Sequence, residues 1–202
     1  MADNLPVIHP DTELRPADAR VGYGVFATRP IPRGTITWVH DALDQTFSPD
    51  DVAAMLPLHR AAIIRYAYVE PRGSFVLCWD HARYNNHACR PSCRTVGDFD
   101  VAVRDIPRGG ELTIEYAVVN VRESFRCACG DPHCRGTVQP DDARRCADVW
   151  DDEAMQAILV APSVPQPLAP LFDGSPALSR AVLAAARGEP VTLPSSRDFV
   201  LL

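Results

Sequence analysis

The sequence predicts a mainly β fold of short strands, with short helices and many loops. Proline supplies 19 of the 202 residues, and proline interrupts helices because it has no backbone N–H to donate. Two similar turns, at residues 29–34 and 104–110, each precede a short apolar run that reads as a strand. Repeated turns of this kind indicate hairpins joined into small sheets.

Composition limits both the fold and the function. A chain of 202 residues with 47% hydrophobic side chains can bury the core of one domain with an appendage. The net charge of −6 argues against a general nucleic-acid-binding protein, which needs a basic face. No leader pattern is present, and no run approaches the ~20 apolar residues of a membrane span. We therefore expect a cytoplasmic protein with no membrane partner.

The N-terminal segment is expected to lead loosely into the first strands. Residues 1–19 are polar and contain several prolines, so they predict an irregular lead-in. Residues 25–27 are apolar and predict a strand, and residues 35–39 alternate as in a half-buried strand.

Two short helices and a further strand follow. Ser48 is a suitable N-cap, Pro49 suits the first helical position, and the acids after it suit a helix N-terminus, so a helix is expected as far as Met55. Residues 58–66 predict a second helix. Residues 74–78 are apolar and predict the next strand.

The second half of the chain predicts two more strands and a helical tail. The strands are expected at residues 99–103 and 111–116. Residues 140–160 have a weakly helical pattern, and residues 161–170 are rich in proline and read as a linker. A short helix is expected to begin at Ser175 and Pro176 and to end at Gly188. One apolar stripe of this helix would contain Leu178, Val182, Leu183 and Ala186.

Residues 83–91 are the most informative run of the chain. They combine a cation, an aromatic ring, two amides, an imidazole and a thiol. Such residues are rare inside helices and strands, because polar side chains compete for the backbone hydrogen bonds. Pro91 also holds the preceding residue in an extended conformation. A polar segment like this, between apolar strands, is either a solvated loop or a functional site.

The run Gly22-Tyr23-Gly24 allows two readings. Glycine permits close approach of the backbone to a ligand, but it also serves in tight turns between strands. The run is not a dinucleotide-binding fingerprint, because no helix follows it and the third glycine is missing.

Three closely spaced cysteines predict a metal site. Cys127, Cys129 and Cys134 form a C-x-C-x4-C pattern with glycine and proline in the loop. Structural zinc takes four thiolate or imidazole ligands, so one ligand is missing, and either His133 or Cys89 could supply it. The other cysteines read as small core or surface residues, namely Cys78, Cys93 and Cys146.

Four of these features occur in a fixed order, and together they resemble the SET-domain methyltransferases with a post-SET zinc motif. They are the Gly-Tyr-Gly run, residues 83–91, residues 110–116 and the cysteine pattern. In that family the last three read R-F-x-N-H-x-C-x-P-N, G-E-E-L-T-x-D-Y and C-x-C-G-x4-C-R-G. The chain is most similar to the small stand-alone bacterial SET proteins.

The resemblance implies a SET fold of small mixed β-sheets. In that fold a C-terminal segment threads under an earlier loop in a pseudoknot-like arrangement, which joins the second and third motifs into one site. The implied organisation is a lead-in at residues 1–19, a SET domain at 20–122, a post-SET zinc motif at 123–138 and a C-terminal extension at 139–202.

The resemblance also implies the roles of individual residues. Tyr116 would be the catalytic tyrosine, and Cys89 is preferred over His133 as the fourth zinc ligand. S-adenosylmethionine would be bound by Gly22, Tyr23, Gly24, Arg83, Tyr84, Asn86 and His87. A structural zinc ion would be bound by Cys89, Cys127, Cys129 and Cys134.

The implied activity is methyl transfer to a lysine side chain of a protein, and a basic protein would suit the net charge of −6. Four residues depart from the family pattern, of which Gly110 and Glu115 replace a glutamate and an aspartate. Ile114 stands where the family often has an aromatic ring that helps to set the number of methyl groups, and Ser92 replaces an asparagine. The alternative function is a catalytically silent SET fold that serves as a zinc-stabilised protein-interaction module.

Overall fold

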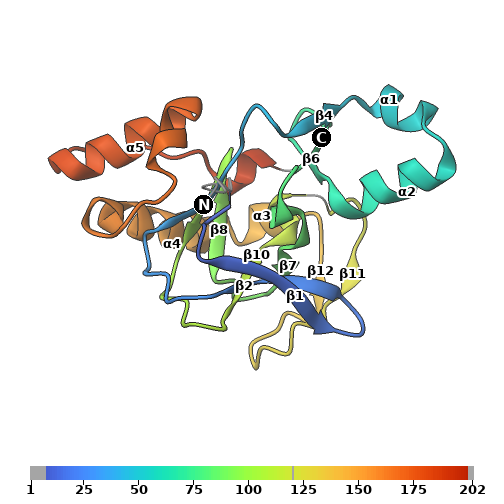
Figure 1. Cartoon of the computed structure of the whole chain (residues 1–202), viewed down its shortest axis with the longest axis horizontal. Helices are drawn as coiled ribbons and strands as arrows, with labels where there is room; N and C mark the ends of the chain where they lie inside the picture. Colours follow the sequence, from blue (N-terminus) through green and yellow to red (C-terminus); the bar gives the residue numbers. More distant parts are fainter. Residues whose placement is uncertain (1–7, 120, 200–202) are drawn as a thin grey trace, which may run out of the picture.

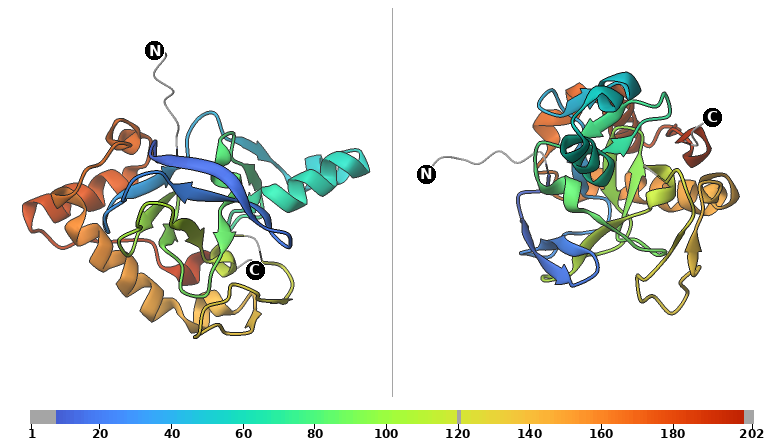
Figure 2. Two further views of the ribbon diagram at one scale, coloured as in Figure 1. Left: turned by 60° about the horizontal axis from the view of Figure 1, so that its bottom comes forward. Right: turned by 90° about the vertical axis from the view of Figure 1, so that its right-hand side faces the viewer.

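The computed structural model describes residues 8–119 and 121–199 as small β-sheets joined by short helices. The helices within residues 49–66 lie at one end of the molecule and the helix at residues 176–187 lies at the other, with the sheets between them (Figures 1 and 2). This arrangement confirms the predicted mainly β fold with short helices. Within the described residues, no helix is long and apolar enough to cross a membrane.

A four-stranded sheet joins segments that are far apart in the sequence. Its order is β1 (Thr12–Asp18), β2 (Gly22–Ala27), β10 (Glu111–Ile114) and β7 (Asn86–His87). Strand β7 runs parallel to β10, whereas the other pairs are antiparallel. The pairing of β7 with β10 places the second and third sequence motifs side by side, as the resemblance implies.

Strand β1 corrects the expectation of a loose lead-in. Thr12–Asp18 pairs along its length with β2, although most of its side chains are polar and exposed or half-exposed. An edge strand is held by its backbone hydrogen bonds and needs no apolar alternation, which is why its sequence carries no strand signal. Residues 1–7 of the lead-in lie outside the described residues.

A three-stranded sheet forms the centre of the core. It contains β3 (Ile36–Val39), β9 (Phe99–Ala102) and β8 (Cys93–Val96), in that order. The strand predicted at residues 35–39 is confirmed as β3, but it is not half-buried, because all four residues of β3 are buried. One apolar cluster covers each face of the sheet. Ile36 belongs to the cluster shared with the C-terminal helices, and Trp38 belongs to the cluster shared with β2 and β10.

The third sheet carries two helices at its edge. Its strands are β4 (Gln45–Phe47), β6 (Phe75–Leu77) and β5 (Tyr68–Val69), and the helices are α1 (Pro49–Ala54) and α2 (Pro57–Tyr66). Ser48 caps α1 as predicted, because its Oγ accepts from the backbone N–H of Asp51 at 3.1 Å. Both predicted helices and the strand predicted at residues 74–78 are confirmed.

The two similar turns of the sequence pair with each other. Ile31 and Ile106 exchange backbone hydrogen bonds of 2.9 and 2.8 Å, and both side chains are buried. The two turns therefore hold the segment after β2 against the segment before β10.

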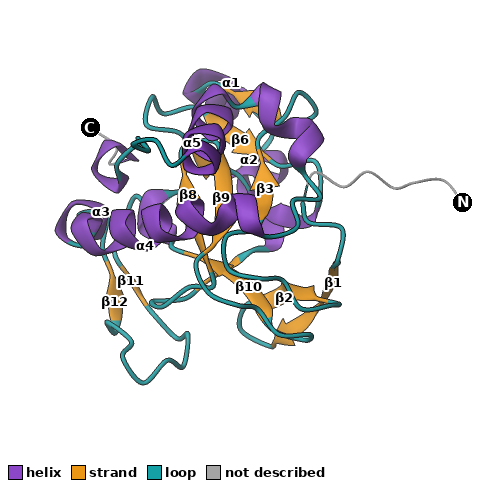
Figure 3. Cartoon of the chain, turned by 90° about the vertical axis from the view of Figure 1, so that its left-hand side faces the viewer, coloured by secondary structure: helices purple, strands orange, loops and turns teal. Residues whose placement is uncertain are grey.

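The C-terminal tail packs onto the three-stranded sheet. It contains α3 (Asp142–Arg145), α4 (Ala147–Val160) and α5 (Pro176–Arg187), and α4 lies across β8 and β9 (Figure 3). The predicted linker at residues 161–170 was wrong, because Ala161 and Leu168 are buried and the segment forms short 3-10 turns.

A glutamine side chain fastens this segment to the sheet. The amide of Gln166 donates to the backbone oxygens of Gly34 and Ala161, and its Oε1 accepts from the backbone N–H of Ile36 at 2.9 Å. Proline-rich composition gave no sign of the contacts to Gly34 and Ile36, since these residues are more than 100 positions away.

Helix α5 begins after Ser175 and ends at Gly188 as predicted, but its buried face differs in part. Leu178 is fully buried, whereas Leu183 is 49% exposed. Ala186 is also exposed. The residues of α5 that pack on the core are Leu178, Ala181, Val182 and Ala185.

Candidate active site and cysteine cluster

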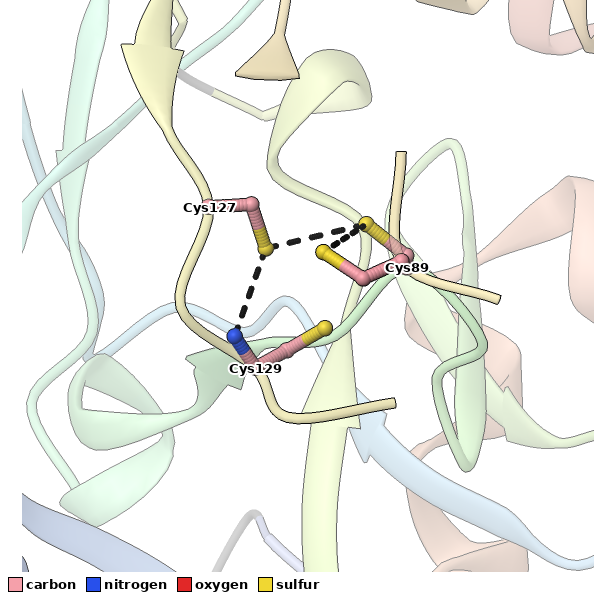
Figure 4. Close-up of side chains that lie close together, drawn as sticks. Cys89, Cys127 and Cys129 are labelled. Carbon is pink, nitrogen blue, oxygen red and sulfur yellow. Dashed lines mark hydrogen bonds between the residues drawn. The ribbon is translucent and has the colours of Figure 1, made fainter. Parts of the chain in front are cut away.

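The four cysteines predicted to bind zinc come together at one point. The ligand atoms of Cys89, Cys127, Cys129 and Cys134 all lie within 4.8 Å of one another. Cys89 Sγ is 3.6 Å from Cys127 Sγ and 3.8 Å from Cys134 Sγ. Figure 4 shows the labelled side chains of Cys89, Cys127 and Cys129 turned toward a common centre.

Sulfur atoms at these separations suit a tetrahedral metal ion. Zinc–sulfur bonds of about 2.3 Å place the four sulfurs of a tetrahedron about 3.8 Å apart. The other candidate ligand, His133, is different, because its side chain is 74% exposed and its Nδ1 lies 3.7 Å from an Asp131 carboxylate oxygen. The cysteine set could therefore hold zinc without a histidine.

The local backbone directs the thiols inward. Cys127 follows β11 (Phe125–Arg126), which pairs with β12 (Thr137–Val138), and Gly130 and Gly136 have positive φ angles of 75° in the loop between these strands. Backbone N–H groups of Cys129, Arg135 and Gly136 donate to cluster sulfurs at 3.3–3.4 Å. Such donors favour the thiolate form that binds metal.

The predicted cofactor residues lie on neighbouring strands. The Asn86 side-chain amide donates to the backbone oxygen of Tyr23 at 3.0 Å and to Glu111 Oε1 at 2.8 Å. A Cβ at Gly24 would meet Asn86 Nδ2 at 2.9 Å, so a larger residue there would displace the Asn86 amide. A Cβ at Gly22 would meet no atom within 4 Å, and its φ is +85°. The backbone at Gly22 is thus open to a ligand.

Three tyrosine rings lie next to this open backbone. The ring of Tyr84 is 6.2 Å from that of Tyr23 and 5.3 Å from that of Tyr66. The guanidinium of Arg83 donates to the backbone oxygens of Asp80 and Trp79 at 3.0 and 2.8 Å. Arg83 therefore holds the turn that positions Tyr84.

Tyr116 lies where β10 ends, with its hydroxyl fixed. The hydroxyl donates to the backbone oxygen of Asn85 at 2.8 Å. Burial raises the pKa of Tyr116 to about 12, so the phenol keeps its proton at neutral pH. The ring is 5.5 Å from that of His87 and 6.3 Å from that of Phe125.

His87 links Tyr116 to the cysteine cluster as a neutral imidazole. Its Nδ1 accepts from the backbone N–H of Tyr116 at 3.3 Å, and its Nε2 lies 3.5 Å from Cys89 Sγ. Burial, together with the nearby guanidinium groups of Arg135 and Arg94, lowers the pKa of His87 to about 4.

Sequence reasoning missed a buried ion pair beside Tyr116. The fully buried carboxylate of Glu115 accepts from Arg135 Nη2 at 2.9 and 2.8 Å. Arg135 directly follows Cys134, the last cysteine of the cluster, so this ion pair connects the cysteine loop to the end of β10. The arginine was visible in the C-R-G motif, but its partner depends on the folded chain.

Ser92, which stands where the family pattern has asparagine, ties the turn after Pro91 to β10 through its hydroxyl. Its Oγ donates to the backbone oxygen of Glu111 at 3.0 Å and accepts from the backbone N–H of Thr113 at 2.9 Å. The turn after Pro91 is therefore tied to β10 in spite of the shorter side chain.

A narrow pocket adjoins Tyr116. Its internal volume of about 60 Å³ suits a side chain or a few waters and not a cofactor. Tyr68 and Ile114 line it, and Tyr68 also packs edge-on against Trp38 with the ring centroids 5.9 Å apart. Sequence reasoning did not place four further polar or aromatic lining residues here, which are Trp38, Asn85, Thr95 and Asp100.

Comparisons with known proteins show which family part of this chain is similar to. A family model described as SET domain matches residues 22–117. Histone-lysine N-methyltransferase ASHH2 of Arabidopsis thaliana is 38% identical in an alignment of 71 residues that covers 29% of this chain and 4% of that protein. The H3 lysine-36 specific histone-lysine N-methyltransferase of Schizosaccharomyces pombe is 26% identical in an alignment of 157 residues that covers 65% of this chain and 19% of that protein.

Among solved structures, a Plasmodium falciparum chain described as a proposed histone methyltransferase aligns with a TM-score of 0.42 and 17% identity, over 54% of this chain and 95% of its own. The present chain covers only a small part of the length of the two curated relatives. Residues 22–117 of this chain therefore correspond to a SET domain.

Proposed function

We propose that this chain is an S-adenosylmethionine-dependent protein-lysine N-methyltransferase. The observation that carries the proposal is the meeting of three features at one place. The open backbone at Gly22 precedes Tyr23, whose backbone oxygen accepts from the Asn86 side chain. The Tyr116 hydroxyl donates to the backbone oxygen of Asn85, the residue before Asn86, and both Tyr116 and Asn85 line the narrow pocket. S-adenosylmethionine, when bound, supplies a methyl group on a positively charged sulfur.

The pocket suits a lysine side chain. An amine attacks a methyl carbon only when it is neutral, and a free lysine with a pKa near ~10.4 is neutral in about one molecule in 2500 at pH 7, a handicap of about 4.6 kcal/mol. An apolar pocket disfavours the ammonium form and removes part of this handicap. The aromatic and aliphatic walls formed by Tyr68, Ile114 and Tyr116 would provide that environment.

Tyr116 would then align the amine for in-line attack. Its phenol stays protonated, and its hydroxyl is held by the backbone oxygen of Asn85. A fixed hydroxyl restricts the amine to a small range of directions, and alignment of two reactants can supply several kcal/mol of the barrier reduction. A basic protein is the proposed substrate class, because the chain carries a net charge of −6.

We further propose that residues 123–138 form a post-SET zinc motif. The residues that would hold the zinc ion are Cys89, Cys127, Cys129 and Cys134. Four sulfur ligands leave no open position on zinc, so the ion would be structural and not catalytic. Because Cys89 follows the Asn86-His87 pair closely, the ion would fix the cofactor wall to the cysteine loop. The cytoplasmic location stays a prediction.

Methyl transfer from tritium-labelled S-adenosylmethionine to basic proteins, including core histones, tests the function. We expect Tyr116→Phe to lower the transfer rate about 100-fold, since it removes one fixed polar contact at the reacting atoms. Calorimetric titration should show unchanged one-to-one cofactor binding by this variant, whereas Asn86→Ala should weaken that binding. Equal rates for wild type and Tyr116→Phe would contradict the assignment of Tyr116.

A further inference from the structure

The pocket beside Tyr116 has a polar closed end that the reaction described above does not use. Arg65, which lines the pocket, is exposed, whereas Asp100 is 4% exposed, so the pocket runs from the surface to strand β9. Alternation along β9 explains the direction of Asp100. Its neighbours Phe99 and Val101 belong to the cluster under the C-terminal helices, and Asp100 lies on the other face.

Asp100 is a buried acid that forms no ion pair with a basic side chain in the part of the chain that the structure describes. Its Oδ1 accepts from Thr95 Oγ1 at 2.6 Å. Burial raises its pKa to about 6, and the charged group that adds to this shift is Asp80, which has the same sign. The titratable and charged groups around this end of the pocket are Asp44, Tyr68, Glu70, Cys78, Asp80, Arg83, Cys93 and Arg104. Arg83 lies on the Asp80 side, where its guanidinium donates to backbone oxygens.

Two further polar atoms at this pocket have no hydrogen-bond partner among the described residues. They are the indole N–H of Trp38 and the side-chain oxygen of Asn85, and both are buried. Buried polar atoms of this kind are normally satisfied by water, and a volume of about 60 Å³ can hold a few waters. The backbone oxygen of Asn85 also accepts from the Tyr116 hydroxyl. Tyr116, Asn85, Trp38 and Asp100 thus line one pocket.

We propose that Asp100, through water held by Asn85 and Trp38, accepts the proton that the substrate ammonium must lose before methyl transfer. This inference rests on the proposed function. The ammonium gives one proton to the water chain, and the Asp100 carboxylate becomes a carboxylic acid. The neutral amine then forms a bond to the methyl carbon as the carbon–sulfur bond breaks, and both electrons of that bond stay on sulfur. Asp100 returns its proton to solvent after product release.

The pH dependence of Asp100→Asn tests this role, because asparagine keeps the shape and can still accept from Thr95. Single-turnover methyl transfer to core histones is measured from pH 6 to pH 10. We expect Asp100→Asn to be about 100-fold slower than wild type at pH 7, with the difference shrinking toward pH 10, where solvent itself removes the proton. A merely structural role would lower the rate by one factor at every pH, and that result would overturn the inference, as would an unchanged rate.

Asp98→Asn is the matched control. Asp98 belongs to the same β8–β9 hairpin, is half-buried, and accepts from Ser175 Oγ at 2.7 Å outside this pocket. Its rate should stay within about twofold of wild type at every pH. A loss equal to that of Asp100→Asn would assign the effect to the hairpin and overturn the inference.

Infrared titration gives a readout without substrate. Wild type should gain the band of a protonated buried carboxyl as the pH falls through about 6, and Asp100→Asn should lack that change. Absence of the band in wild type would sink the inference while the methyltransferase assignment stands. Wild type that binds S-adenosylmethionine but methylates no probe would instead contradict the proposed function, and the inference with it.

Discussion

The cysteine loop and the helical tail both brace the site, but they are held by different forces. In the loop, at residues 123–138, the two strands have two residues each and most side chains are exposed or half-exposed. The tail instead buries Ile158, Phe172 and Leu178 against the three-stranded sheet. Hydrophobic burial is sufficient for the tail, whereas the loop lacks enough apolar surface and needs a cross-link. A metal ion would therefore stabilise the loop, whereas the buried contacts of Ile158, Phe172 and Leu178 do not involve it.

Removal of one thiol should have the largest effect. Cys129→Ser should abolish binding of about one zinc ion per chain and unfold residues 123–138, because zinc contributes ~10 kcal/mol or more to folding in small metal-dependent motifs. Elemental analysis and amide hydrogen exchange would measure the two losses, with the tail still protected. Cys146→Ser, at a half-buried cysteine outside the cluster, should keep the zinc. Metal-free protein with full protection of the loop would refute this prediction.

A leucine pair in α5 tests the other region. Leu178→Ala should lower the free energy of unfolding by about 3 kcal/mol, since a fully buried leucine leaves a cavity. Leu183→Ala, in the same helix but 49% exposed, should change it by less than about 0.5 kcal/mol. Urea unfolding of both variants would measure the difference, and zinc content should be unchanged in each. Equal losses would mean that the buried face of α5 is assigned incorrectly.

The same contrast shows what the sequence could predict. Short-range signals were sufficient for the cap at Ser48, the end of α5 at Gly188 and the cysteine cluster, because each depends on residues a few positions apart. The exception was Cys89, which lies 38 positions before Cys127, and its place came from the family resemblance.

Features that depend on distant residues were missed. Strand β1 is polar, and only its pairing with β2 identifies it as a strand. The segment at residues 161–170 has the composition of a linker, and only the hydrogen bond between Gln166 and β3 shows that it is packed. Asp100 stands in a run that predicts only a strand, and its position at the end of the pocket depends on packing of β3, β8 and β9. Pairing over long distances leaves little local trace in a sequence, which is why the candidate site was predicted more completely on its cysteine side than at the closed end of the pocket.

The smallest expected effect on stability concerns Asp100, which is part of β9 in the three-stranded sheet and lines the pocket. Burial raises its pKa from 3.8 to about 6, so between these values the folded protein binds the proton more tightly than the unfolded chain. Stability attributable to this group is therefore lost as the pH rises through about 6, and the carboxylate destabilises the fold at pH 7.5. Asp100→Asn should remove that penalty and raise the free energy of unfolding by roughly 1–2 kcal/mol at pH 7.5, with no gain at pH 4.

Urea unfolding of wild type and Asp100→Asn at pH 7.5 and pH 4 measures the difference in free energy of unfolding between the two proteins. Any loss of metal at low pH affects both proteins equally and therefore cancels in this difference. A variant less stable than wild type at pH 7.5 would show that the ionised carboxylate stabilises the fold. A gain would mean that the chain gives up stability to keep an acid at the end of the pocket, as expected of a group retained for its chemistry.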